Sequence, residues 1–359
     1  MTLKRSWAIL LCGAVNFINA QGSSMEGEII TPRSYTAYKA NQIIQIDGEA
    51  REQDWKDAPW STPFIDIEGD KIPPYATQMK MLWDPDHLYV YARLEEPHIW
   101  GTLKQRDTVI FYNNDFEIFI DPDGDTHNYV EFEMNVLNTV WDLFLTAPYR
   151  NNPKVLNQWD IKGLRSAVYI QGSLNDPRDI DEFWSLEVAI PWKALKEASA
   201  SPMPPEGQFW RMGFSRVNWD FELAGISYLR KKDASDAYLP EYNWVWSPQG
   251  VINMHEPEKW GYVFFSAKPP QNKHDFIMDE EERLKWFMYE QYRKILLAFK
   301  NGDPITALHW DAQTTLNGTK VQLELTPHQN GFILSCQSPF SSLTLLINTS
   351  GKFSSYETP

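Results

Sequence analysis

The stretch NNDFEIFIDPDGDTHNYVEFEMN, residues Asn113 to Asn135, alternates polar and apolar side chains on both sides of a tight acidic turn. Successive side chains of a β-strand point to opposite faces, so this alternation predicts two strands joined at the turn. The acidic side chains of such a hairpin are compatible with a metal loop, a pair of catalytic carboxylates or a binding surface. The second strand would place two sets of side chains on opposite faces: Tyr129, Glu131, Glu133 and Asn135 on one, and Val130, Phe132 and Met134 on the other.

Similar short runs extend outward from this hairpin and are separated by turn residues. These runs are TQMKMLW, LYVYARL, TVWDLFL, SAVYIQG, WSLEVAIP, FWRMGFSRV, NWVWSP and WGYVFFS. About ten strands without long helices between them predict an antiparallel sandwich or barrel in one large domain, which we place at residues 42–267. The segment PWKALKEA predicts one short helix within it.

A different composition begins after KPPQNKH. The segment DEEERLKWFMYEQYRKILLAFKNG has acidic residues in its first turn and ends on Asn301 and Gly302, which predicts a helix of about 20 residues. One apolar face of it must dock on other residues: Leu284, Met288, Tyr292, Ile295 and Phe299. The tail returns to β alternation, so residues 275–359 are expected to form a small α+β appendage, a candidate docking element for a protein partner.

The N-terminal segment MTLKRSWAILLCGAVNFINAQ has the basic start, apolar middle and small final residue of a secretory signal peptide over residues 1–20, cut near Ala20. Cys336 would be the one cysteine left after cleavage, which excludes an intrachain disulfide. We therefore expect a secreted or periplasmic protein without a transmembrane segment. A net charge of −15 and a pI near 4.9 argue against a nucleic-acid partner and are compatible with a neutral ligand.

The turn DPDGD resembles the start of a calcium loop, because hard cations bind several closely spaced carboxylates. An EF-hand would need a glutamate at its twelfth position, where this chain has Phe132, so the EF-hand interpretation fails. Two interpretations of the turn stay open. Asp121, Asp123 and Asp125 either bind a structural calcium ion or simply build the hairpin connection.

Glu131 and Glu133 lie two residues apart on one strand face, about 6.6 Å from each other, which is near the carboxyl separation of an inverting glycosidase. Any Glu-x-Glu strand has this spacing, and the same oxygens would accept hydrogen bonds from sugar hydroxyls. A glycoside hydrolase that uses this pair is therefore an alternative to a binding protein. The scattered histidines give no zinc spacing, and no G-x-S-x-G nucleophile motif is present.

The order and spacing of the predicted elements resemble the family 9 carbohydrate-binding modules, specifically the stand-alone secreted type common in Bacteroidetes. The resemblance covers roughly residues 42–266 and is carried by successive runs: DGEAREQDWKDAPW, LWDPDHLYVYARLEEPHIWGTL, NNDFEIFIDPDGDTHNYVEFEMN, TVWDLFLTAPYR, GSLNDPRDIDEFWSLEVAIPWKAL, WRMGFSRVNWD and NWVWSPQGVINMHEPEKWGYVFFS. It implies a DOMON-like, jelly-roll-like antiparallel β-sandwich that holds a sugar, often the reducing end of a glycan, between aromatic rings. Members of the family can also hold structural calcium.

The resemblance implies a set of site residues in this chain. Polar contacts would come from Arg106, Glu117, Glu131 and Asn135, followed by Arg216 and Asn243, and ring platforms from Trp141, Trp219 and Trp244. Trp100, Trp159 and Trp246 are reserve candidates. An indole can stack on the apolar face of a sugar while polar groups at the rim bind its hydroxyls.

The function implied is that of a non-catalytic glycan-binding protein serving polysaccharide catabolism, with an oligo- or polysaccharide as partner. Because related sandwiches can hold haem, a haem-binding DOMON-like module is a further alternative, although the adjacent Met254 and His255 are more typical of a turn than of an axial haem pair.

Overall fold

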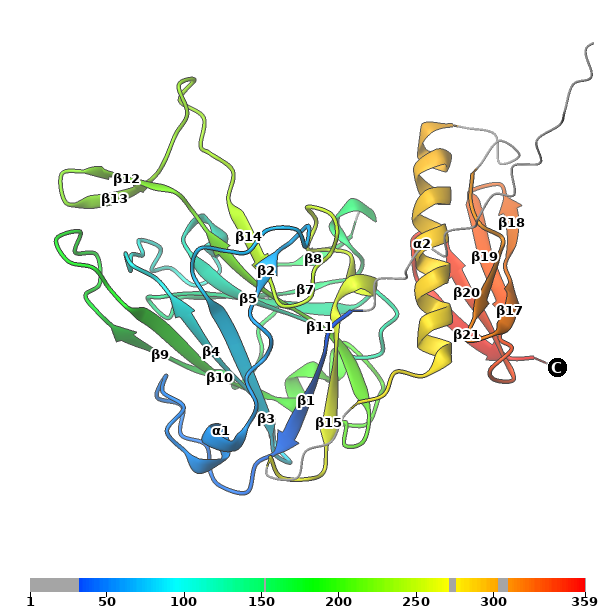
Figure 1. The fold of residues 1–359 in the computed structure, drawn as a ribbon, viewed down its shortest axis with the longest axis horizontal. Coiled ribbons are helices and arrows are strands. Elements are labelled where there is room, and N and C mark those ends of the chain that lie inside the picture. The colour runs from blue at the N-terminus through cyan, green and yellow to red at the C-terminus, as the bar shows by residue number, and fades with distance from the viewer. Residues whose placement is uncertain (1–31, 152, 271–275, 303–308, 359) are drawn as a thin grey trace, which may run out of the picture. The chain divides into compact units, whose positions relative to one another are not determined.

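The computed structural model describes residues 32–151, 153–270, 276–302 and 309–358, and the predicted signal peptide lies outside these ranges. Within them, 13 strands form one large sheet (Figure 1). Its main path follows β8 (Val155–Leu156), β7 (Val140–Leu145), β6 (Tyr129–Asn135), β5 (Asp115–Asp121), β11 (Phe209–Asn218), β15 (Gly261–Ser266), β1 (Ser34–Lys39), β3 (Thr77–Trp83), β4 (His87–Glu95), β10 (Phe183–Pro191) and β9 (Arg165–Gln171). Beside this path, β14 (Tyr242–Val245) pairs with both β11 and β2 (Ile65–Asp66).

The sheet curls around one apolar core, because both halves of its path direct side chains into the same cluster. Ile118 of β5 and Phe132 of β6 share this cluster with Val90 of β4 and Leu186 of β10, and all four are fully buried. The predicted all-β sandwich is therefore confirmed, and every strand run predicted from the sequence forms a strand.

The strand β1 differs from the predicted organisation in two ways. It pairs in parallel with β15 and with β3, whereas the sequence predicted antiparallel neighbours throughout. It also precedes Gln42, so the sheet begins before the predicted start of the domain. Its sequence SYTAYK is short and carries few aliphatic residues, which explains why pattern reading missed it.

Short helices and one hairpin connect the strands. The predicted helix at PWKALKEA is the 3₁₀ helix η3 (Trp192–Glu197). The other connections are α1 (Gln53–Asp57), η1 (Ile110–Tyr112), η2 (Tyr149–Asn151), η4 (Pro257–Lys259) and the hairpin of β12 (Phe221–Ala224) with β13 (Ser227–Arg230). In the described part of the chain, no helix combines the length and apolar character that a membrane span requires.

The C-terminal residues form the predicted helix and a small β structure. Helix α2 (Glu280–Asn301) begins at Asp279, whose side chain accepts a hydrogen bond from the Glu282 amide, and ends at Gly302 in the left-handed conformation. Most of its predicted apolar face is buried, and Tyr292 lies 6.0 Å from the Phe332 ring. The β elements are β16 (Gln313–Leu316) with β17 (Thr319–Gln322), and a sheet of β18 (Glu324–His328), β19 (Gly331–Gln337), β20 (Leu343–Asn348) and β21 (Phe353–Glu357).

The acidic turn of the opening hairpin bonds to this C-terminal segment. The Thr126 hydroxyl donates to the Gly351 carbonyl at 2.9 Å, and the Phe353 amide donates to the Asp125 carbonyl at 3.1 Å. The Lys352 ammonium lies 3.1 Å from an Asp125 carboxylate oxygen. The turn therefore serves as a docking point within the chain, a role that its sequence did not indicate.

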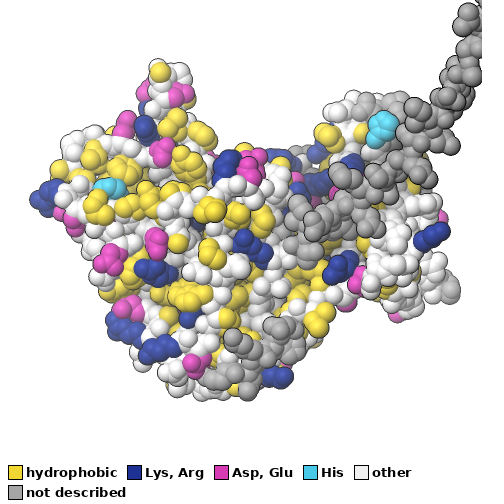
Figure 2. Space-filling model, viewed as in Figure 1, with side chains coloured by type: hydrophobic (Ala, Val, Ile, Leu, Met, Phe, Trp, Pro, Cys, Tyr) yellow, Lys and Arg dark blue, Asp and Glu magenta, His cyan; other side chains and the backbone are white. Residues whose placement is uncertain are grey.

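Charges are mixed on the face drawn in Figure 2, where Lys and Arg side chains are interspersed with Asp and Glu. This face has no continuous basic patch of the kind that binds a phosphate backbone.

Candidate functional site

A cavity of about 340 Å³ lies on the side of the β5–β6 hairpin that faces away from the apolar core. We call it the acidic pocket, because Glu117, Glu131 and Glu133 line it. The other described residues around it include four with aromatic rings and two amides: Phe111, Trp141, Tyr149, His255, Asn243 and Asn253. Carboxylates and aromatic rings thus meet in one cavity, as the sequence analysis predicted for a sugar site.

Strand register places the acidic side chains together. Glu117 of β5 lies directly opposite Glu133 of β6, and Phe119 lies opposite Glu131. Trp141 of β7 lies opposite Glu133 on its other side. Since directly paired residues share a face of the sheet, the indole and the carboxylates converge on the same cavity.

Four carboxylates are crowded on this face. Asp115 is fully buried, and Glu117, Glu131 and Glu133 are at most 5% exposed. Burial raises the pKa of Glu117 to about 7. Burial, together with repulsion from neighbouring carboxylates, also holds the pKa values of the other three well above their ordinary range.

His255 forms one wall of the acidic pocket as a neutral ring. Burial lowers its pKa to about 3, and the charge of Arg150 acts in the same direction. Its Nδ1 lies 2.7 Å from the Tyr129 hydroxyl, and its Nε2 lies 3.8 Å from a Glu131 oxygen. Both ring nitrogens therefore face polar neighbours, and Met254 is buried in an apolar cluster, an arrangement that does not favour axial haem ligation.

The predicted site residues separate into two groups. Glu117, Glu131, Trp141 and Asn243 line the acidic pocket. Asn135 does not, because it is fully buried and closes the β6–β7 turn: its side chain donates to the Leu103 carbonyl at 2.8 Å and accepts from the Leu137 and Thr139 amides.

Arg216 and Trp244, which the sequence analysis predicted as ligand contacts, lie in the interior and do not line the acidic pocket. Both side chains are on the core face, because Arg216 of β11 pairs with Phe116 of β5 on one side and with Trp244 of β14 on the other. The guanidinium is fully buried, lies 4.8 Å from the Trp244 ring and bonds Glu96 at 2.7 Å.

Trp219 is also buried, at 5% exposure, in a separate cluster that includes Trp100 and Tyr228. Its indole N–H donates to the Phe111 carbonyl at 2.7 Å. It therefore supports a residue of the acidic pocket without lining the pocket itself.

Phe111, Tyr149 and His255 line the pocket but were not among the predicted contacts. They come from the η1 and η2 segments and from the loop before η4. Such segments have no periodic pattern that reveals which side chains face a cavity. The one available signal is that Phe111 lies just before the acidic hairpin in the sequence.

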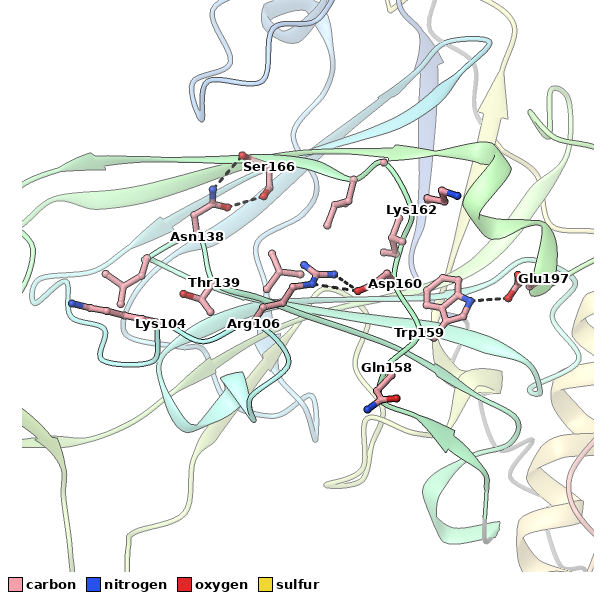
Figure 3. A pocket seen from close by; sticks show the side chains of 15 residues that line it. Lys104, Arg106, Asn138, Thr139, Gln158, Trp159, Asp160, Lys162, Ser166 and Glu197 are labelled. Atoms are coloured by element: carbon pink, nitrogen blue, oxygen red, sulfur yellow. Dashed lines mark hydrogen bonds and ion pairs between the residues drawn. The ribbon is translucent and has the colours of Figure 1, made fainter.

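Arg106 lies in a second cavity of about 930 Å³, which we call the Trp159 pocket (Figure 3). There its guanidinium bridges Asp142 and Asp160. The Trp159 indole donates to Glu197 at 2.8 Å, and Figure 3 shows this bond and the contact of Arg106 with Asp160. These polar groups already satisfy one another, so they offer few free hydrogen bonds to a ligand.

The three aspartates of the predicted calcium turn converge, with one oxygen of each within 4.8 Å of the others. Several of their oxygens already have partners. Asp121 accepts from the Gly124 and Thr126 amides, and Asp125 pairs with Lys352. The donor set suits a hard cation, but an ion here would compete with the lysine.

Comparison with known proteins gives a consistent family match. The model of the family described as "Carbohydrate family 9 binding domain-like" matches residues 46–227. A search of curated protein sequences finds no match.

Three solved structures align over their whole length at 16% identity. A crystal structure of a proposed carbohydrate-binding protein from Bacteroides uniformis covers 66% of this chain, with a TM-score of 0.48. A family 9 carbohydrate-binding module from Caldicellulosiruptor kristjanssonii, solved with cellotriose and with glucose, covers 68% with TM-scores of 0.41 and 0.40. These similarities are too distant to transfer a ligand. Because the family match spans more than half of the chain, the protein belongs to the carbohydrate family 9 binding domain-like family.

Proposed function

We propose that this protein binds the end of an oligo- or polysaccharide in the acidic pocket and does not cleave it. The observation that carries this proposal is the pairing of Trp141 with Glu133 across β7 and β6, which sets an aromatic ring beside hydrogen-bond acceptors in one cavity. The Trp141 indole N–H is buried and has no hydrogen-bond partner among the described residues. Family membership supports the same ligand class.

The size of the pocket supports a terminal sugar rather than a long chain segment. Its volume of about 340 Å³ is near the lower end of the range of about 300–1,000 Å³ that is typical of small-molecule sites. Such a cavity would accept a sugar unit at one end of a glycan, which includes a reducing end.

Trp141→Ala is expected to weaken glycan binding by about 1–3 kcal/mol, because it removes the ring and its free N–H. The matched control is Trp159→Ala, which removes a tryptophan of the Trp159 pocket and should bind normally. Affinity electrophoresis through a panel of polysaccharides identifies the ligand, and calorimetry with its oligosaccharides measures both variants. Loss of binding in Trp159→Ala alone would place the site in the other pocket, and release of new reducing ends would show hydrolysis.

The cellular setting proposed for this binding is polysaccharide catabolism outside the cytoplasm. The predicted signal peptide supports export to the periplasm or cell exterior. The mass of the exported chain would test the predicted cut near Ala20. A protein partner of the appendage stays a prediction, and such a partner would need a surface other than the buried residues of α2.

We also propose that Asp121, Asp123 and Asp125 hold a structural calcium ion at the hairpin turn. Calcium at about 100 times its dissociation constant should stabilise the fold by about 2.7 kcal/mol through this site, because it binds the native turn and not the unfolded chain. Asp123→Asn should reduce that gain in thermal unfolding experiments with calcium and with chelator. Lys352→Met, which frees Asp125, should instead strengthen it. If calcium stabilised the unchanged protein, Asp123→Asn and Lys352→Met by the same amount, this result would contradict the site.

A further inference from the structure

We propose that Asp115, Glu117 and Glu133 form a second site for a hard cation such as calcium, beside the acidic pocket that Glu117 and Glu133 line. One carboxylate oxygen of each lies within 4.8 Å of the others. Calcium binds oxygen at about 2.3–2.6 Å, so oxygens that share one ion lie at most about 5 Å apart. This geometry is met by residues held on two paired strands of the sandwich, where Glu117 lies directly opposite Glu133.

The unpartnered oxygens of the cluster point to a missing ligand. Asp115 Oδ2 and Glu117 Oε2 are buried without a hydrogen-bond partner among the described residues, and so is Glu131 Oε2 beside them. A buried carboxylate oxygen without a partner carries a large desolvation cost, which a bound cation would offset. Two backbone amides donate to the cluster: Val217 to Asp115 at 3.4 Å and Phe111 to Glu133 at 3.0 Å. The Ser215 side chain also interacts with Glu117 and acts against the rise that burial causes in its pKa.

The charge balance also requires a cation or protons. The described residues that line the acidic pocket include Glu117, Glu131, Glu133 and Glu241 but no lysine or arginine. The single basic type among them is His255, which is neutral at ordinary pH. Burial, followed by repulsion from neighbouring carboxylates, raises the pKa values of Asp115 and Glu133, so both groups bind a proton more readily.

The chemistry of the three proposed ligands indicates which kind of ion would bind. All three proposed ligands are carboxylates, which suit hard cations such as calcium, whereas zinc sites in proteins are built mainly from histidine and cysteine. Calcium takes 6–8 oxygens, so the positions left open toward the cavity would be filled by water or by other ligand oxygens. The site does not depend on whether the pocket also binds a glycan.

The test uses chelator-treated protein in an Asp123→Asn background, which removes the calcium site proposed at the turn. Calorimetric titration with calcium should still show one bound ion, and adding Glu133→Gln or Asp115→Asn should weaken that binding at least about tenfold. Without calcium, both additions should raise the thermal midpoint, because each removes one of the crowded negative charges. A thermal unfolding transition in each variant also shows that the variant folds.

Two results would overturn the site. One is that Asp123→Asn abolishes all calcium binding, which would leave the turn as the source of the response. The other is that Glu133→Gln leaves the affinity unchanged. Either result would mean that protons, not a metal ion, neutralise the buried carboxylates.

Discussion

Arg216→Ala is expected to lower the free energy of unfolding by about 3–5 kcal/mol, which is the usual cost of removing one partner of a buried ion pair. The guanidinium is fully buried and bonds the Glu96 carboxylate at 2.7 Å, the Glu95 carbonyl at 2.8 Å and the Thr77 hydroxyl at 3.1 Å. Without it, the Glu96 charge would remain in the interior, with Asn114 as its one remaining side-chain partner among the described residues. Urea denaturation, monitored by tryptophan fluorescence, measures the change in the free energy of unfolding.

A double variant separates loss of the pair from loss of packing. Arg216→Met keeps much of the side-chain volume, and Glu96→Gln removes the charge that would be left unpaired. The two changes together should therefore cost less than the sum of the single changes. If Arg216→Ala kept its stability and lost only glycan affinity, the arginine would be a ligand contact and its structural assignment would be wrong.

Trp244→Ala is expected to destabilise the protein by about 3–5 kcal/mol, because it opens a large cavity in the sandwich core. The ring is 3% exposed, lies 6.1 Å from Tyr75 and covers the Arg216 guanidinium. Trp141→Ala is the matched control, since this partly exposed ring lines the pocket and should matter more for binding than for stability. Denaturant midpoints of the two variants compare these effects.

The opposite pattern would contradict the assignment of both rings. In that case Trp244→Ala would fold with unchanged stability and fail to bind glycan, while Trp141→Ala would unfold more easily. Because Trp244 contacts Arg216, their substitutions are also expected to be non-additive.

Strand parity explains why the predicted site residues do not all line one pocket. Asn243 and Trp244 are neighbours on β14, and neighbours on a strand point to opposite faces, so both could not line one pocket. The register with β11 places Asn243 beside Val217, on the face of the carboxylates, and Trp244 beside Arg216 in the core. The sequence alone could not show which of the two faces was the interior, because both carry aromatic and polar residues.

The sequence by itself determined the elements, since alternation, turn residues and helical spacing are local properties of the chain. It specified most strands of the sandwich but not β1, together with the helix α2 and the face of β6 that carries Glu131 and Glu133. The order of these elements also carried the resemblance to the family, and the family match over residues 46–227 showed membership.

Only the tertiary structure decided which side chains these elements bring together. The pairing of β5 with β6 sets Glu117 opposite Glu133 and brings Asp115 within reach of both, and chain connections bring Phe111 and His255 to the same cavity. The parallel pairing of β1 and the bonds between the acidic turn and the C-terminal segment were decided in the same way. The physical reason is that long-range register and burial depend on the packing of the whole sheet, which no local pattern encodes.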